Sequence, residues 1–218
     1  ILNAQDDLIL LNENITMYGE HTYGKVLLTN SIITVDPSTG FDDGRGTLIL
    51  YADTIIFDNN SSIQANGAGG HFDQSSAGVG NSDDYGSGGG GYGGVGGSGG
   101  SGGATSNGGS TYGQNDILQM GSRGGSSNPT ETAGSGGGAI KLDASYINIS
   151  GGIIANGLQG SNGVNSAHYG NGGGSGGHIM INATILSISG WIQANGGTGG
   201  NTSTLSGSAY DGGGGGGG

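Results

Sequence analysis

Apolar and polar residues alternate in short blocks along this chain, with a period of two rather than 3.6. Within residues 140–144 the apolar positions alternate with Lys141 and Asp143. A period of two is typical of a strand that buries one face. Two shorter blocks of the same kind follow at 147–149 and 153–155. The pattern therefore predicts three short strands separated by corners.

This three-block unit recurs along the chain. The segment GAIKLDASYINISGGIIANG (138–157) aligns without a gap to GHIMINATILSISGWIQANG (177–196), 39 residues later, and 46–67 matches both after a two-residue insertion. Two degenerate copies precede these. In the first alignment, Val26, Leu28, Ile33 and Val35 precede Leu48, Leu50, Ile55 and Phe57 by 22 residues; in the second, Leu8, Leu10, Ile15 and Met17 precede that set by 18. Five copies are predicted.

Stacked copies would form one all-β domain over residues 1–218, a parallel β-helix of about five coils with three short strands each. Equivalent residues would then lie in columns, namely Leu48–Ile140–Ile179, Leu50–Leu142–Ile181, Ala52–Ala144–Ala183, Phe57–Ile149–Ile188 and Ile63–Ile153–Ile192. The column Asn66–Asn156–Asn195 predicts an asparagine ladder at a corner. Unrelated hairpins and an antiparallel sandwich remain as alternatives. However, Asn-Gly here precedes long loops rather than two-residue turns.

Glycine-rich loops separate the predicted strands. They comprise an insertion at 67–137 and shorter loops at 157–176 and 196–218, and residues 90–104 read as five Gly-Gly-X triplets. A period of three suits bundled polyproline-II-like helices, which have three residues per turn. Flexible Gly/Ser linkers have a similar composition. Both interpretations stay open for this tract.

Composition excludes several classes of protein. With 57 Gly but only two Pro in 218 residues, collagen is excluded, and without Cys so is a disulfide scaffold. A net charge of −12 disfavours nucleic acid as a partner. The longest apolar run, Leu48 to Ala52, is too short to span a membrane. The chain lacks a signal peptide and begins at Ile, which suggests a mature segment or an internal piece.

Catalytic and metal-binding patterns are weak. The predicted outward columns Tyr51–Asp143–Asn182 and Ile49–Lys141–Met180 each hold one ionisable group, so we expect no catalytic residues and no enzyme activity. The four histidines (His21, His71, His168 and His178) lack metal-site spacing. Asp6–Asp7, Asp42–Asp43 and Asp83–Asp84 leave bound Ca²⁺ as a minor alternative, and no other cofactor is expected.

Six asparagines occupy Asn-x-Ser/Thr sequons. They are Asn14, Asn59, Asn60, Asn148, Asn182 and Asn201, and all six are candidate N-glycosylation sites if the source is eukaryotic. Asn148 and Asn182 fall on outward positions of the predicted strands, where a glycan would not disturb the core.

The chain resembles glycine-rich parallel β-helix proteins, which occur as large secreted or surface polypeptides in bacteria and protists. The resemblance rests on GG-[AGS]-I-x-I-x-A…I-x-G-x-I-x-A-N-G, matched by residues 138–157 and 177–196 and loosely by 46–67. It implies an extracellular or cell-surface adhesin, coat or fibre protein.

Two functions follow as hypotheses. The first is a structural subunit of an extracellular fibril or coat that assembles with itself, because neither Ile1–Leu2 nor Gly212–Gly218 supplies a polar cap. The second is an adhesin module that binds surface glycans through aromatic rings on the glycine-rich loops. Those rings are Phe72, Tyr85, Tyr92, Tyr112, Tyr169 and Tyr210, which could equally pin the loops in place.

Overall fold

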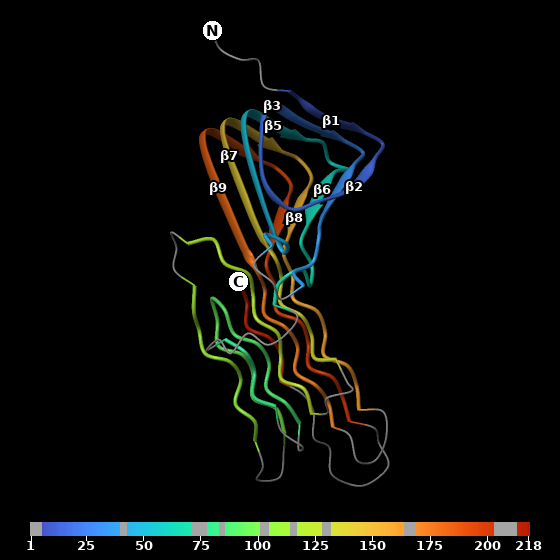
Figure 1. Ribbon diagram of the computed structural model, residues 1–218, viewed down its shortest axis with the longest axis vertical. Helices are drawn as coiled ribbons and strands as arrows, with labels where there is room; N and C mark the ends of the chain where they lie inside the picture. Colours follow the sequence, from blue (N-terminus) through green and yellow to red (C-terminus); the bar gives the residue numbers. More distant parts are fainter. Residues whose placement is uncertain are drawn as a thin grey trace.

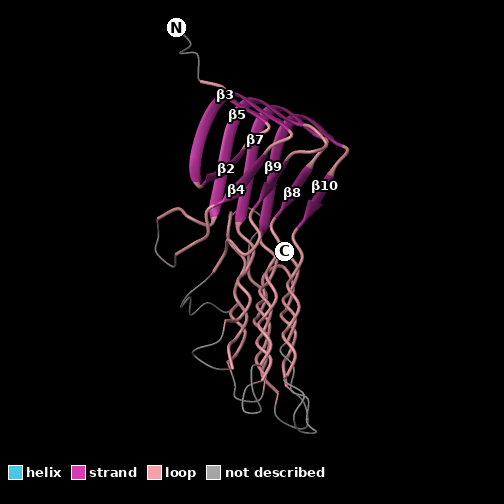
Figure 2. Ribbon diagram, turned by 90° about the vertical axis from the view of Figure 1, so that its right-hand side faces the viewer, coloured by secondary structure: helices cyan, strands magenta, loops and turns pink. Residues whose placement is uncertain are grey.

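The computed structural model describes residues 6–39, 43–70, 78–82, 86–100, 105–113, 117–127, 132–163, 169–202 and 213–218. These residues contain ten strands and no helix, which confirms the all-β prediction. The strands occupy one end of an elongated molecule, and the glycine-rich segments run side by side away from them (Figure 2). No helix that could cross a membrane is found in the described ranges.

The strands form two sheets of five, and every neighbouring pair is parallel. The first sheet has the order β1 (Leu8–Leu11), β3 (Gly19–Thr29), β5 (Thr47–Phe57), β7 (Ala139–Ile149), β9 (His178–Ile188). The second has the order β2 (Asn14–Met17), β4 (Ile32–Val35), β6 (Ser62–Gln64), β8 (Gly152–Ile154), β10 (Trp191–Gln193). The chain alternates between the sheets, so each of the five copies supplies one strand to each (Figure 1).

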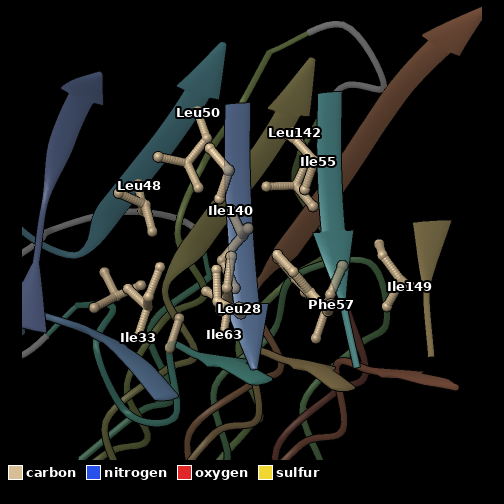
Figure 3. Packing of buried hydrophobic residues seen from close by; sticks show 14 of the residues in the cluster. Leu28, Ile33, Leu48, Leu50, Ile55, Phe57, Ile63, Ile140, Leu142 and Ile149 are labelled. Carbon is tan, nitrogen blue, oxygen red and sulfur yellow. The ribbon is translucent and has the colours of Figure 1, made fainter. Parts of the chain in front are cut away.

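The strand register confirms the predicted aliphatic columns. Leu142 pairs with Leu50 on one side and with Ile181 on the other. The other four columns also pair as predicted: Leu48–Ile140–Ile179, Ala52–Ala144–Ala183, Phe57–Ile149–Ile188 and Ile63–Ile153–Ile192. Their middle members are buried in one cluster that both sheets enclose (Figure 3). Aliphatic side chains stacked at the strand spacing of about 4.8 Å fill this interior without polar groups.

The prediction of three short strands per copy is wrong in one respect. Residues 140–144 and 147–149 belong to a single 11-residue strand, β7, and β3, β5 and β9 are equally long. The pairing ladder omits Asp53 and Ser145, and the buried positions shift from even to odd numbers across this point. The predicted corner is therefore a bend within a continuous strand.

The predicted 22-residue offset between the second and third copies is also wrong. Val26 pairs with Ile55, not with Leu48, because residues Gly19–Tyr23 form the first half of β3 and pair with Leu48–Ala52. His21 and Tyr23 there take the places that Leu50 and Ala52 hold in β5. A search for alternating aliphatic residues cannot detect such a half-strand.

The described glycine-rich segments form a hydrogen-bonded bundle, which argues against a flexible linker there. Its centre is the buried segment 170–177. Successive N–H groups of this segment donate in rotation to three neighbouring segments: Asn171 to Ser161, Gly172 to Gly125, Gly173 to Gly213, Gly174 to Leu158, Ser175 to Ser122, Gly176 to Gly216 and Gly177 to Ala155. The donor direction therefore repeats every three residues.

Carbonyl groups of the same central segment accept from three further segments. Gly172, Gly173 and Gly174 accept from Gly134, Gly90 and Gly197, respectively. The central segment is thus surrounded by six neighbours that bond directly to its backbone. A Cβ added at Gly174 would overlap the backbone of Ser135, so the absence of a side chain is what permits this approach.

Candidate functional site

The most unusual surface of the molecule is its β9–β10 edge, the outer strand of each sheet at the C-terminal side. Column positions that are 0% exposed in the preceding copy are open here. Relative to Ile147, Ile149 and Ile153, their partners are exposed by 50% for Leu186, 37% for Ile188 and 43% for Ile192. The edge therefore presents core residues to the surroundings.

Charge does not protect this edge. Residues 178–193 contain no Asp, Glu, Lys, Arg or Pro. Natural sheets usually protect a long outer strand with such residues, because its unpaired N–H and C=O groups can template another strand. Trp191 lies against Gly152, where an added Cβ would meet the indole ring, and remains 45% exposed. The edge combines unpaired backbone with an apolar surface.

The opposite edge is formed by β1 and β2. Inward positions Leu8, Leu10, Ile15 and Met17 continue the same columns there, and all four contact the core. Ile9 and Leu11 are exposed on β1. Asp6, Asp7, Glu13 and Glu20 lie nearby and are exposed, so this edge is acidic whereas the β9–β10 edge is uncharged.

The structure brings Asn66, Asn156 and Asn195 together in a ladder. The backbone N–H of Asn156 donates to Oδ1 of Asn66 at 3.0 Å, and that of Asn195 donates to Oδ1 of Asn156 at 2.8 Å. A fourth contact of this kind, from the N–H of Asn201 to Oδ1 of Asn162 at 2.8 Å, was not predicted. These bonds tie successive copies together just beyond the second sheet.

Another asparagine pair was missed at the corner between β1 and β2 and between β3 and β4. Asn12 and Asn30 both have positive φ, 60° and 47°, and Asn30 Nδ2 donates to Oδ1 of Asn12 at 2.8 Å. Asparagine tolerates this left-handed conformation better than most residues. The signal in the sequence was an Asn at the same place in two copies, 18 residues apart.

The outward face of the first sheet carries one small polar cluster. Lys141 Nζ lies 3.2 Å from Oδ2 of Asp143 and 5.0 Å from the centre of the Tyr51 ring, and Asn182 donates to Asp143 Oδ1 at 3.2 Å. Burial lowers the pKa of Lys141, but hydrogen bonds to Asp143 and Tyr51 outweigh it, so the pKa is raised. The cluster is a satisfied ion pair beside an open groove of about 410 Å³, with no second carboxylate facing Asp143.

Metal-ligating side chains do not gather among the described residues, where no group of three or more His, Asp and Glu occurs. Asp6 and Asp7 are exposed, and Asp43 pairs with Arg45 at 3.3 Å. Asp42, Asp83, Asp84, His71 and His168 lie outside the described residues.

The sequon asparagines are spread over the surface. Asn14, Asn59, Asn60, Asn182 and Asn201 are exposed, whereas Asn148 is half-buried in β7 between Ile56 and Ser187. The structure brings none of these described side chains into a common site.

The described loop aromatics pack against the protein. Tyr92 is buried, contacts the Tyr112 ring edge to face at 4.8 Å between centroids, and places its hydroxyl 2.9 Å from Nδ1 of His178. Tyr112 donates to the carbonyl of Met120 at 2.6 Å. Tyr169 is half-buried, and Phe72, Tyr85 and Tyr210 lie outside the described residues. Tyr92 and Tyr112 thus serve to pin the glycine-rich segments.

Comparison of the chain with protein-family models, curated proteins and solved structures finds no match.

Proposed function

We propose that this protein is a structural subunit of an extracellular fibre or surface coat, and that its copies associate end to end. In this proposal the two sheets are the sides of a short parallel β-helix, and the glycine-rich segments are a bundle of polyproline-II-like helices. The alternation of strands between two parallel sheets and the three-residue rotation of hydrogen bonds in segment 170–177 support these assignments.

The observation that carries the proposal is the uncharged, apolar β9–β10 edge. Leu186, Ile188 and Ile192 are exposed there, although their column partners are fully buried. Covering them with another strand pair would bury apolar surface at about 25 cal/mol per Å² and would satisfy the unpaired backbone groups of both outer strands.

The edge formed by β1 and β2 fits this role in a second copy. If the register of the columns continues across the contact, Leu8 stacks on Leu186, Leu10 on Ile188 and Ile15 on Ile192. These pairs repeat the aliphatic contacts already made inside each subunit. The exposed carboxylates near β1 meet an uncharged surface, so this orientation avoids like-charge repulsion.

The two edges are different surfaces, so the contact is heterologous. A heterologous contact that does not close into a ring propagates into an open filament. The extracellular or cell-surface location is part of the proposal and is supported by exposed sequon asparagines and the absence of cysteine thiols. We do not favour glycan binding by the loop aromatics, because Tyr92 and Tyr112 are packed inward.

Sedimentation and electron microscopy test the assembly. The wild-type protein is expected to form filaments as its concentration rises, with a blue shift in the emission of Trp191, its only Trp. Ile188→Lys should raise the concentration needed for assembly by at least tenfold. Ile185→Lys is the matched control, because Ile185 is exposed on the same strand but in register with outward Tyr146. Monomers at every concentration, or equal effects of both variants, would contradict the proposal.

A further inference from the structure

A cavity of about 310 Å³ lies where the glycine-rich bundle meets the start of β5. Its described lining includes Val79, Tyr112, Leu118 and Met120 together with Arg123. This volume is at the lower end of the range of small-molecule sites, about 300 to 1,000 Å³. The cavity lies apart from the β9–β10 edge and takes no part in the proposed assembly.

The walls of the cavity are mainly apolar, and two of them are fixed by glycines. Met120 Sδ occupies the space that a Cβ on Gly46 would need, and the Tyr112 ring does the same at Gly78. The Tyr112 hydroxyl is already engaged, since it donates to the Met120 carbonyl and accepts from Ser122 Oγ at 2.9 Å. Tyr112 therefore offers the cavity its ring rather than a free polar group.

Arg123 is the one charged residue among the described lining residues. Its Nε is buried and has no hydrogen-bond partner, and no ion pair to its guanidinium is found among the described residues. The chain has only four Lys and Arg against 16 acidic residues, yet this cation is left without a carboxylate. A buried, unpaired charged group is costly unless an anion or hydrogen-bond acceptor meets it.

We propose that this cavity binds an organic carboxylate with a short apolar body. The carboxylate pairs with the Arg123 guanidinium, which offers a planar fork of donors to two oxygens. The apolar body lies against Val79, Leu118 and Met120. The amide of Gln119 and the hydroxyl of Thr47 are also at the cavity and can complete the polar end.

Calorimetry with octanoate, 1-octanol and octylamine tests the charge requirement. Octanoate is expected to bind at least tenfold more tightly than either of the others. Arg123→Met should weaken octanoate binding at least tenfold, whereas Arg45→Met should not, because Arg45 pairs with Asp36 and Asp43 and does not line the cavity. Equal binding of the three compounds, or unchanged binding by Arg123→Met, would overturn the proposal.

Methyl labelling of methionine locates the site without any substitution. The chain has three methionines, and only Met120 lines the cavity, whereas Met17 lies in β2 and Met180 in β9. Octanoate should shift the Met120 methyl signal in a saturable manner and leave the other two in place. A saturable shift at Met17 or Met180 instead, or no shift at Met120, would refute the assignment even if Arg123→Met failed to fold.

Discussion

The hydroxyl oxygen of Tyr92 lies 2.9 Å from Nδ1 of His178, which joins the glycine-rich bundle to the first residue of β9. The two rings are 5.9 Å apart between centroids, and His178 also hydrogen-bonds to the backbone of Ile117. Burial raises the pKa of Tyr92 to about 12, with a further contribution from Tyr112, so the phenol stays protonated. A neutral His178 can accept its proton.

This contact predicts a pH-dependent stability. Burial lowers the pKa of His178 below its ordinary value of 6.5, although the Ile117 hydrogen bond opposes the shift. The unfolded chain therefore takes up this proton more readily than the folded one. The contribution is fully present above pH 6.5 and is lost as the pH falls through the folded-state pKa.

Urea titrations between pH 7.5 and 5.5 measure this effect. Relative to wild type, His178→Gln should show a smaller loss of unfolding free energy on acidification, whereas His21→Gln should retain the wild-type slope. A His178→Gln profile parallel to that of the wild type would exclude the histidine as the cause.

Adjacent glycines in the bundle should respond oppositely to alanine. A Cβ at Gly213 would overlap the backbone of Gly97, and one at Gly215 would overlap Gly174, so either substitution should cost about 1–3 kcal/mol. At Gly214 the nearest atom is 3.7 Å away, and alanine there should be neutral or stabilise by up to about 1 kcal/mol. Thermal melts of the three single variants decide this, and equal destabilisation would argue against the close-packed bundle.

The asparagine ladder should make a small but measurable contribution. Asn156→Ala removes the acceptor for the N–H of Asn195 and should lower the unfolding free energy by about 1 kcal/mol. Asn59→Ala changes an exposed asparagine outside the ladder and should have little effect. Amide hydrogen exchange at Asn195 offers a local readout, and unchanged protection there in Asn156→Ala would count against the bond.

Two residues of one column should differ because only one is covered. Ile147→Ala should cost about 2–5 kcal/mol, since Ile147 is fully buried. Leu186→Ala, at the β9–β10 edge, should cost the monomer less than about 1 kcal/mol, since half of the side chain is exposed. Under assembling conditions the cost at Leu186 should rise towards that at Ile147. A cost at Leu186 that does not change with protein concentration would show that assembly leaves this residue uncovered.

Alternation alone predicted the long C-terminal copies, their register and the aliphatic columns, because an inward Ile or Leu must face its counterpart in the neighbouring strand. The first half of β3 escaped prediction, since His21 and Tyr23 fill inward positions where the pattern requires aliphatic residues. The joining of two predicted strands into β7 also escaped, because a bend at Ser145 shifts the buried phase in the same way as a corner would.

What the amino-acid sequence determined by itself was local and periodic: parallel-compatible strands of period two, five copies, and glycine tracts of period three. Which of these segments meet was decided only in three dimensions. The bundle depends on backbone contacts between residues as distant as Gly90 and Gly216, and the cavity depends on Arg123 lying beside Val79 and Leu118. Glycine has no side chain with which to specify a partner, so the choice of neighbours follows from the stacked strands that hold both ends of each glycine-rich segment in register.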